Sequence, residues 1–236
     1  VIKIIKIPLF LITNQESFVI QIYQKKVGII GDVIIDKYKF YAAVRLSPEG
    51  PAPIVRFINE HQTLGGAGNV AISIANLGLN AELFYPYSEK IDQKQIEFIK
   101  SKCKEYSIKL KSIKTDFRNP VPLKIRYYVD DKQFMREDIE ENQIKLNSIF
   151  RNEFIENYIH NYDLIILSDY QKGFLSPESI KDIIDYCNKK DIPLFIDTKI
   201  RNPRFLENAF CIKINLIEYN KLFENHKLKN NYSTDK

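Results

Sequence analysis

Cysteine and histidine are scarce in this chain of 236 residues, and their scarcity excludes several kinds of site. The three cysteines, Cys103, Cys187 and Cys211, form no C-x-x-C pair, and no histidine stands at metal-ligand spacing near them. The three histidines are isolated as well, so no Ser-His-Asp or Cys-His arrangement is evident. Unpaired cysteines are typical of a reduced compartment, and we expect a cytoplasmic protein.

Long apolar runs and concentrated positive charge are also lacking. No apolar run reaches the ~18–20 residues that a membrane-spanning helix needs, so no membrane partner is expected. Residues 1–26 are treated as an N-terminal extension; Lys3 and Lys6 interrupt its apolar start, and no signal-peptide cleavage site follows. The net charge of +5 is modest, and the lysines lie among acidic neighbours, which argues against nucleic acid. A mild basic excess suits a cleft that holds several negative charges.

Short apolar runs alternate with amphipathic helical patterns along most of the chain. Strands are predicted over 27–30, 82–85, 164–167, 192–196 and 211–214, and helices over 69–77, 92–106, 148–161 and 177–189. This alternation predicts an α/β fold with a doubly wound parallel sheet. Two segments depart from it. Residues from about 38 to 59 hold three prolines and no helical period, and residues from about 118 to 137 hold a predicted hairpin, so together they predict a small β lid.

Polar residues gather where the predicted strands end. Asp32, Asp36, Asp169 and Asp197 follow four such strands, and ligands of open α/β sheets bind at that edge. Gly65 and Gly66 permit close approach of a ligand to the backbone, just before a helix that starts at Asn69. The basic candidates for a phosphate clamp are Arg45, Lys124, Arg126, Arg136 and Lys172. The pattern predicts a sugar-phosphate site. Alternatively, the aspartates cap helices or bond loop amides, and the basic residues form a solvated hairpin face.

A second glycine pattern raises a different class of enzyme as an alternative. Residues 66–71 (GAGNVA) match the G-x-G-x-x-A form of the dinucleotide fingerprint, so a nicotinamide-dependent oxidoreductase is considered, but the context of the glycines is wrong for it. That fingerprint should follow the first strand directly, whereas here a proline-rich segment intervenes. No G-x-x-x-x-G-K-[ST] sequence occurs, which excludes a P-loop kinase.

Short motifs over residues 27–223 resemble, in order, those of the ribokinase-like (PfkB) carbohydrate kinases, and within them the D-glycero-D-manno-heptose 7-phosphate kinases, which also occur as the kinase domain of bifunctional kinase/adenylyltransferases. The motifs are GDVIIDKY (31–38), RLSPEGPAP (45–53), GGAGN (65–69), PLKIR (122–126), QFMRED (133–138), LSDYQKG (167–173), IDTK (196–199) and NLIE (215–218). The resemblance implies a three-layer α/β/α sheet with a β lid. It also implies transfer of the ATP γ-phosphate to an anomeric hydroxyl, with Mg²⁺, for lipopolysaccharide or capsule precursors.

The resemblance also implies roles for individual residues. Sugar hydroxyls would contact Asp36, Gly65, Gly66 and Asn69, with Asp32 and Asp169 at the same edge; Arg45, Lys124, Arg126 and Arg136 would cover the sugar, and Lys172 would lie near its phosphate. The nucleotide side comprises Asp197, Lys199, Asn215 and Glu218, of which Asn215 and Glu218 would support Mg²⁺ through water. Spacing alone also permits an ordinary helix start, with Asn215 as cap and Glu218 in the first turn. A homodimer through the lid is expected by analogy.

The sequence departs from the family pattern in places. Thr198 stands where the family usually has proline. No Gly-Ala-Gly-Asp sequence occurs, although in the family this sequence supplies an anion hole and the aspartate base. We therefore assign no catalytic residue. We treat residues 27–236 as a partial kinase domain, incomplete at its C-terminus, and expect these residues alone to be inactive. A catalytically dead sugar-phosphate-binding or dimerisation module remains an alternative, as does a kinase of another sugar.

Overall fold

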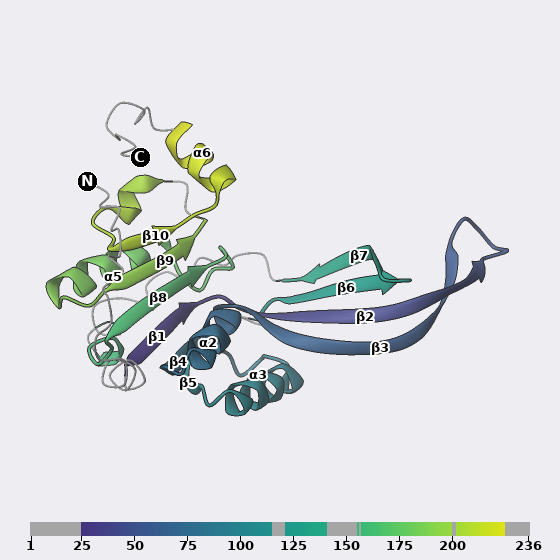
Figure 1. Cartoon of the computed structure of the whole chain (residues 1–236), viewed down its shortest axis with the longest axis horizontal. Helices are drawn as coiled ribbons and strands as arrows, with labels where there is room; N and C mark the ends of the chain where they lie inside the picture. The colour runs from purple at the N-terminus through teal and green to yellow at the C-terminus, as the bar shows by residue number, and fades with distance from the viewer. Residues whose placement is uncertain (1–24, 115–120, 141–154, 156, 200–201, 225–236) are drawn as a thin grey trace, which may run out of the picture.

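The computed structural model describes residues 25–114, 121–140, 155, 157–199 and 202–224 (Figure 1). Its body is a six-stranded parallel sheet in the order β10-β9-β8-β1-β4-β5. The strands are β1 (Lys26–Gly31), β4 (Asn80–Tyr87), β5 (Lys109–Lys114), β8 (Leu164–Asp169), β9 (Leu194–Thr198) and β10 (Cys211–Lys213). Within the described part of the chain, no helix is long and apolar enough to span a membrane.

Helices cover both faces of this sheet because its central strands are apolar on both sides. In β1, Val27 and Ile29 pack against α2 (Ala67–Asn76) and α3 (Gln93–Glu105), whereas Ile30 packs into the core beneath α5 (Pro177–Lys189). A 3-10 helix, η1 (Pro203–Leu206), and α6 (Leu216–Glu224) complete the described elements. The predicted three-layer α/β/α architecture is confirmed.

A second sheet projects from the carboxyl edge of the body (Figure 1). It has the order β3-β2-β6-β7 and comprises β2 (Val33–Leu46), β3 (Pro53–Gly66), β6 (Leu123–Val129) and β7 (Lys132–Ile139). We call these four strands the lid sheet. Its long strands join the body directly, since β2 begins two residues after β1 ends and β3 runs into α2. Any side chain at the root of the lid sheet is therefore next to the body.

Several sequence predictions differ from the structure in extent. The excursion predicted from about residue 38 has no break at its start, because β2 already begins at Val33. The edge strand β5 was missed, since alternating lysines in KLKSIK weaken its apolar signal. The helix α2 begins at Ala67 instead of Asn69. The helix predicted over 148–161 and the extension over 1–26 fall largely outside the described residues.

Candidate functional site

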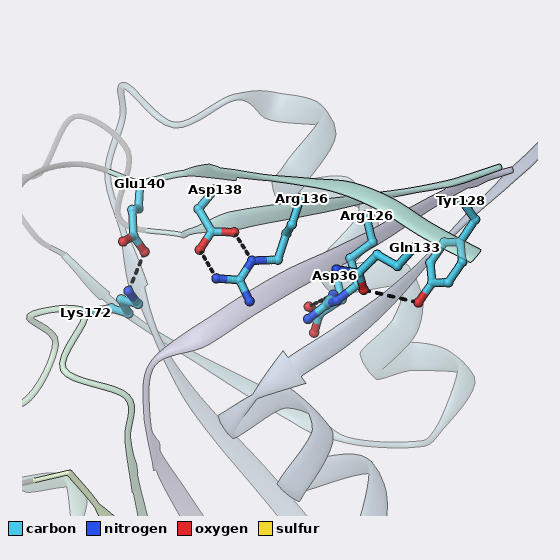
Figure 2. Close-up of polar contacts among 8 residues, drawn as sticks. All are labelled: Asp36, Arg126, Tyr128, Gln133, Arg136, Asp138, Glu140 and Lys172. Atoms are coloured by element: carbon cyan, nitrogen blue, oxygen red, sulfur yellow. Dashed lines mark hydrogen bonds and ion pairs between the residues drawn. The ribbon is translucent and has the colours of Figure 1, made fainter. Parts of the chain in front are cut away.

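Polar and charged side chains converge where the lid sheet leaves the body. Figure 2 shows three ion pairs there, Asp36 with Arg126, Arg136 with Asp138, and Lys172 with Glu140. The first four of these residues lie on lid strands, and Lys172 lies in the loop after β8. Six predicted substrate residues, Asp36, Gly65, Lys124, Arg126, Arg136 and Lys172, thus fall in one region.

Asp36 and Gly65 form the innermost pair of this region. Nη1 of Arg126 donates to Oδ1 of Asp36 at 2.5 Å, and both side chains are largely buried. A Cβ at Gly65 would lie 2.1 Å from Oδ2 of Asp36, so only glycine leaves room for that carboxylate. The Asp36 bond and burial act in opposite directions on Arg126; the bond dominates and raises its pKa. The site therefore holds a rigid carboxylate–guanidinium pair beside bare backbone.

Cations dominate the next positions along the lid. Lys124 is paired in register with Asp36 on β2 and with Asp138 on β7, while Arg136 bonds Asp138 through two nitrogens at 2.9 and 3.1 Å. Burial lowers the pKa of Lys124, and the nearby charge of Lys172 lowers it further. No carboxylate of the described residues lies within ion-pair distance of Lys124. This half-buried ammonium is suited to an incoming anion.

Asp32 organises the loop that follows β8. Its carboxylate is 2% exposed and accepts hydrogen bonds from the backbone amides of Tyr170, Lys172 and Phe174 at 2.8, 3.0 and 3.2 Å. Burial, with the charge of Asp169, raises the pKa of Asp32 to about 6 despite these bonds. Asp32 thus matches the alternative considered from the sequence, in which a strand-end aspartate bonds loop amides and does not bind a ligand. Its burial gives no support to a direct hydroxyl contact.

Asp169 is also directed inward. It is 3% exposed, accepts from the Thr198 hydroxyl at 2.6 Å and from the Gln171 amide at 2.8 Å, and burial raises its pKa. Thr198, which departs from the family pattern, thus gains a hydrogen bond to a strand-end carboxylate. Together Asp32 and Asp169 fix the loop from Tyr170 to Phe174 against the sheet.

A second group surrounds Tyr170 on the other side of the loop. Lys199 lies 4.9 Å over the Tyr170 ring, and Asp197 pairs with Lys213 at 2.8 Å. Burial raises the pKa of Tyr170, and the charges of Asp197, Asp36 and Glu218 add to the effect. The Tyr170 hydroxyl is therefore influenced by carboxylates of both the lid and the predicted nucleotide residues. Tyr170 belongs to the motif of residues 167–173, but no role was predicted for it.

Asn215 and Glu218 form the capping box of α6. The Glu218 amide donates to Oδ1 of Asn215 at 2.8 Å, and the Asn215 amide donates to Oε2 of Glu218 at 2.9 Å. The ordinary helix start considered from spacing is thus present. It leaves the second carboxylate oxygen of Glu218 without a hydrogen bond in the described part of the chain, which fits a Mg²⁺ ion held through water. Across the described residues, no three His, Cys, Asp or Glu side chains cluster as a metal site.

Two predicted site residues, Arg45 and Asn69, lie apart from these contacts, and Gly66 bears on the alternative dinucleotide pattern. Arg45 is paired with Ile54 at the far end of the lid sheet, nine residues along β2 from Asp36, which corresponds to about 30 Å. Asn69 is exposed in the first turn of α2. Gly66 has φ +56° and ends β3, so the glycine pattern follows a lid strand and not β1. That position removes the structural context that a dinucleotide fingerprint requires.

Two further groups bear on the chemistry. The lid face that carries Arg126 also carries a ladder of rings, in which His61 stacks on Tyr38 and Phe40 at 4.8 and 5.5 Å, and Phe40 stacks on Tyr128. Alternation along the strands predicted a two-faced hairpin but not this ladder. The thiols of Cys103 and Cys187 are buried, and burial raises the pKa of each to about 12, so neither is a nucleophile at neutral pH.

Comparison with known proteins finds relatives over most of the chain. The chain is 31% identical over 203 residues to the bifunctional protein HldE of Histophilus somni, which covers 84% of this chain and 41% of that protein. It is 28% identical over 190 residues to HldE of Syntrophotalea carbinolica, covering 79% and 38%. The chain thus spans about two fifths of the curated relatives it matches. No protein-family model matches it.

Solved structures agree with the fold. A carbohydrate kinase from Agrobacterium tumefaciens superimposes with a TM-score of 0.62 at 16% identity, covering 84% of this chain and 63% of that one. Phosphofructokinase-2 from Escherichia coli, in complex with substrates and products, gives 0.61 at 17%, covering 85% and 63%. The chain has the fold of the ribokinase-like (PfkB) carbohydrate kinases. Within that group it is a relative of the HldE proteins, as the motifs predicted.

Proposed function

We propose that this chain is the sugar-phosphate-binding part of an ATP-dependent kinase that phosphorylates the anomeric hydroxyl of D-glycero-D-manno-heptose 7-phosphate. One observation carries the proposal, namely the group of cations at the root of the lid sheet beside Asp36. Four cations, Lys124, Arg126, Arg136 and Lys172, face three carboxylates there, so the region has an excess positive charge. A phosphorylated sugar supplies the missing negative charge, and its hydroxyls match Asp36 and the backbone at Gly65.

The fold alone does not identify the sugar, so the assignment to heptose needs further support. It rests on the motif from Arg45 to Glu49, on the motif from Ser168 to Gly173, and on the relationship to HldE proteins. A kinase of another sugar phosphate is the neighbouring alternative, because phosphofructokinase-2 has the same fold. The ring ladder of Tyr38, His61, Phe40 and Tyr128 offers a flat apolar surface for either sugar.

ATP and Mg²⁺ belong to the second group of residues in this proposal. Lys199, Asp197, Asn215 and Glu218 would lie along the nucleotide phosphates, and the metal would neutralise charge that develops on the transferred group. Tyr170 and the loop anchored by Asp32 separate the two groups and would align acceptor with donor. No catalytic base is assigned, and a catalytically dead binding module remains the second candidate. A cytoplasmic location remains a prediction.

Calorimetry with heptose 7-phosphate, followed by phosphorus NMR with ATP and Mg²⁺, tests the proposal. We expect binding that Lys124→Met weakens by about tenfold or more, because a half-buried ammonium loses its anion. Lys132→Met, at the exposed hairpin turn of the lid, is the matched control and should bind normally. A new anomeric phosphate signal shows a kinase whose base lies among the residues present; binding without that signal is expected of an incomplete kinase and of a dead module alike; no binding refutes the proposal.

A homodimer through the lid sheet is part of the same proposal. Large apolar side chains are exposed along it, among them Phe57 at 53%, Leu46 at 75% and Phe134 at 65%. An exposed apolar sheet of this kind is typical of an interface. Phe57→Asp should shift sedimentation from dimer to monomer at micromolar concentration, whereas Val44→Thr should not; a wild-type monomer would contradict the interface.

A further inference from the structure

Lys172 is held by a carboxylate from the lid sheet. Its ammonium lies 2.5 Å from Oε2 of Glu140, the residue that follows β7, and the two side chains are 21% and 35% exposed (Figure 2). Lys172 itself belongs to the loop after β8, whose amides are bonded to Asp32. The pair thus connects the end of the β6–β7 hairpin to a loop that is bonded to the body sheet.

This contact differs from its neighbours in what it joins. Asp36–Arg126, Asp138–Arg136 and Lys37–Glu60 each lie within the lid sheet, and the other ion pairs lie within the body. Among the described residues, Lys172–Glu140 is the one ion pair between lid and body. Breaking it changes how the two parts are connected, whereas breaking the others does not.

We propose that Glu140 is a positioning residue, an internal counter-ion that holds Lys172 until the phosphate of the substrate takes its place. The inference rests on the proposed function. Lys172 has one ammonium, and a phosphate dianion with three acceptor oxygens is a stronger partner for it than one carboxylate. Glu140 and the phosphate repel one another at the same cation, so binding frees the end of β7 from the loop.

The exchange makes phosphate recognition conditional. A sugar without phosphate has hydroxyls only, which cannot displace a carboxylate from an ammonium, so the lid stays tied to the body. A phosphorylated sugar breaks the tie and lets the lid sheet settle on the sugar held at Asp36. Glu140 therefore favours phosphorylated over unphosphorylated sugars through a penalty that only an anion overcomes.

Affinity of Glu140→Gln for heptose 7-phosphate provides the first test. We expect binding on the order of three- to tenfold tighter than wild type, since a partly exposed ion pair no longer competes. Glu137→Gln removes the same charge three residues earlier, on β7, but the Glu137 carboxylate accepts from the Tyr127 hydroxyl, so this change should leave affinity unchanged. In a Lys172→Met background, Glu140→Gln should add nothing. Equal affinities of Glu140→Gln and Glu137→Gln would refute the exchange.

A second test needs no substrate and separates this inference from the proposed function. Acetylation of surface amines, followed by peptide mass spectrometry, reports how firmly each lysine is held. Lys172 should react several-fold faster in Glu140→Gln than in wild type, while Lys181, which pairs with Asp185 on α5, should react equally in both. An unchanged Lys172 rate overturns the inference. If Lys172 is acetylated faster in Glu140→Gln but the protein does not bind heptose 7-phosphate, the role of the Lys172–Glu140 ion pair is supported and the proposed function is refuted instead.

Discussion

Ionised Asp32 should make the folded protein less stable at neutral pH than in mild acid. Burial raises the pKa of this carboxyl from its ordinary 3.8 to about 6. Because the folded-state pKa is the higher one, the proton is held more tightly in the folded state. Below about pH 4 the carboxyl is protonated in both states. Between about pH 4 and 6 the unfolded state loses this proton while the folded state keeps it, so the free energy of unfolding falls; above pH 6 both states are ionised and the full cost is reached. One pKa unit is about 1.4 kcal/mol, so the full cost is about 3 kcal/mol.

Asp32→Asn removes this titration and provides the assay. The free energy of unfolding, from urea titrations followed by far-ultraviolet circular dichroism, is compared for both proteins at pH 4, 5, 6 and 7. The difference should shift in favour of Asp32→Asn by about 2 kcal/mol between pH 4 and 7, because the carboxyl of the unfolded state is already partly ionised at pH 4. Asp185→Asn, on the exposed side of α5, is the control. A pH-independent difference would refute the reasoning.

Three other substitutions test separate contacts. Gly65→Ala should weaken heptose 7-phosphate binding at least tenfold in calorimetry, because its Cβ would lie 2.1 Å from the Asp36 carboxylate; unchanged binding would show that the carboxylate can move. Asn215→Ala should cost about 1 kcal/mol of stability in thermal unfolding through loss of the α6 cap, and Asn215→Asp should restore it. Thr198→Val leaves the Asp169 carboxylate short of one donor and should destabilise by about 1–3 kcal/mol, whereas Thr198→Ser should not.

Local signals explain the parts of the fold that the sequence predicted well. The helix predicted over 177–189 is α5 (Pro177–Lys189), because the Ser176 cap and Pro177 define its start within a few residues of chain. The body strands other than the edge strand β5 were also found, since they carry apolar runs. By contrast, β2 was recognised only as a segment without helical period, because one face of a lid strand is polar and its pairing partners, β3 and β6, lie elsewhere in the sequence.

The sequence named candidate site residues but did not predict how the structure arranges them. Asp32 was identified because it follows a strand, but its three amide partners lie 138 to 142 residues away. Neither its burial nor its hydrogen bonds to the loop after β8 could therefore be predicted from the sequence. Alternation put Arg126 and Arg136 on a hairpin, but a register shift at Tyr127 decides which residues oppose one another. Glu140 was missed because nothing in its local sequence indicates a partner in a distant loop.

The length of the lid sheet turns it into a lever. β2 and β3 each have 14 residues, which corresponds to an arm of about 45 Å from root to tip. Since the root is the pair Val33 and Gly66, adjoining β1 and α2, a rotation of about 5° there sweeps the tip by about 4 Å. The converse holds as well: a modest force on the tip exerts a large torque at the root. Whatever grips the tip around Leu46 and Pro53 therefore sets the angle at which Asp36 and Lys124 meet a ligand.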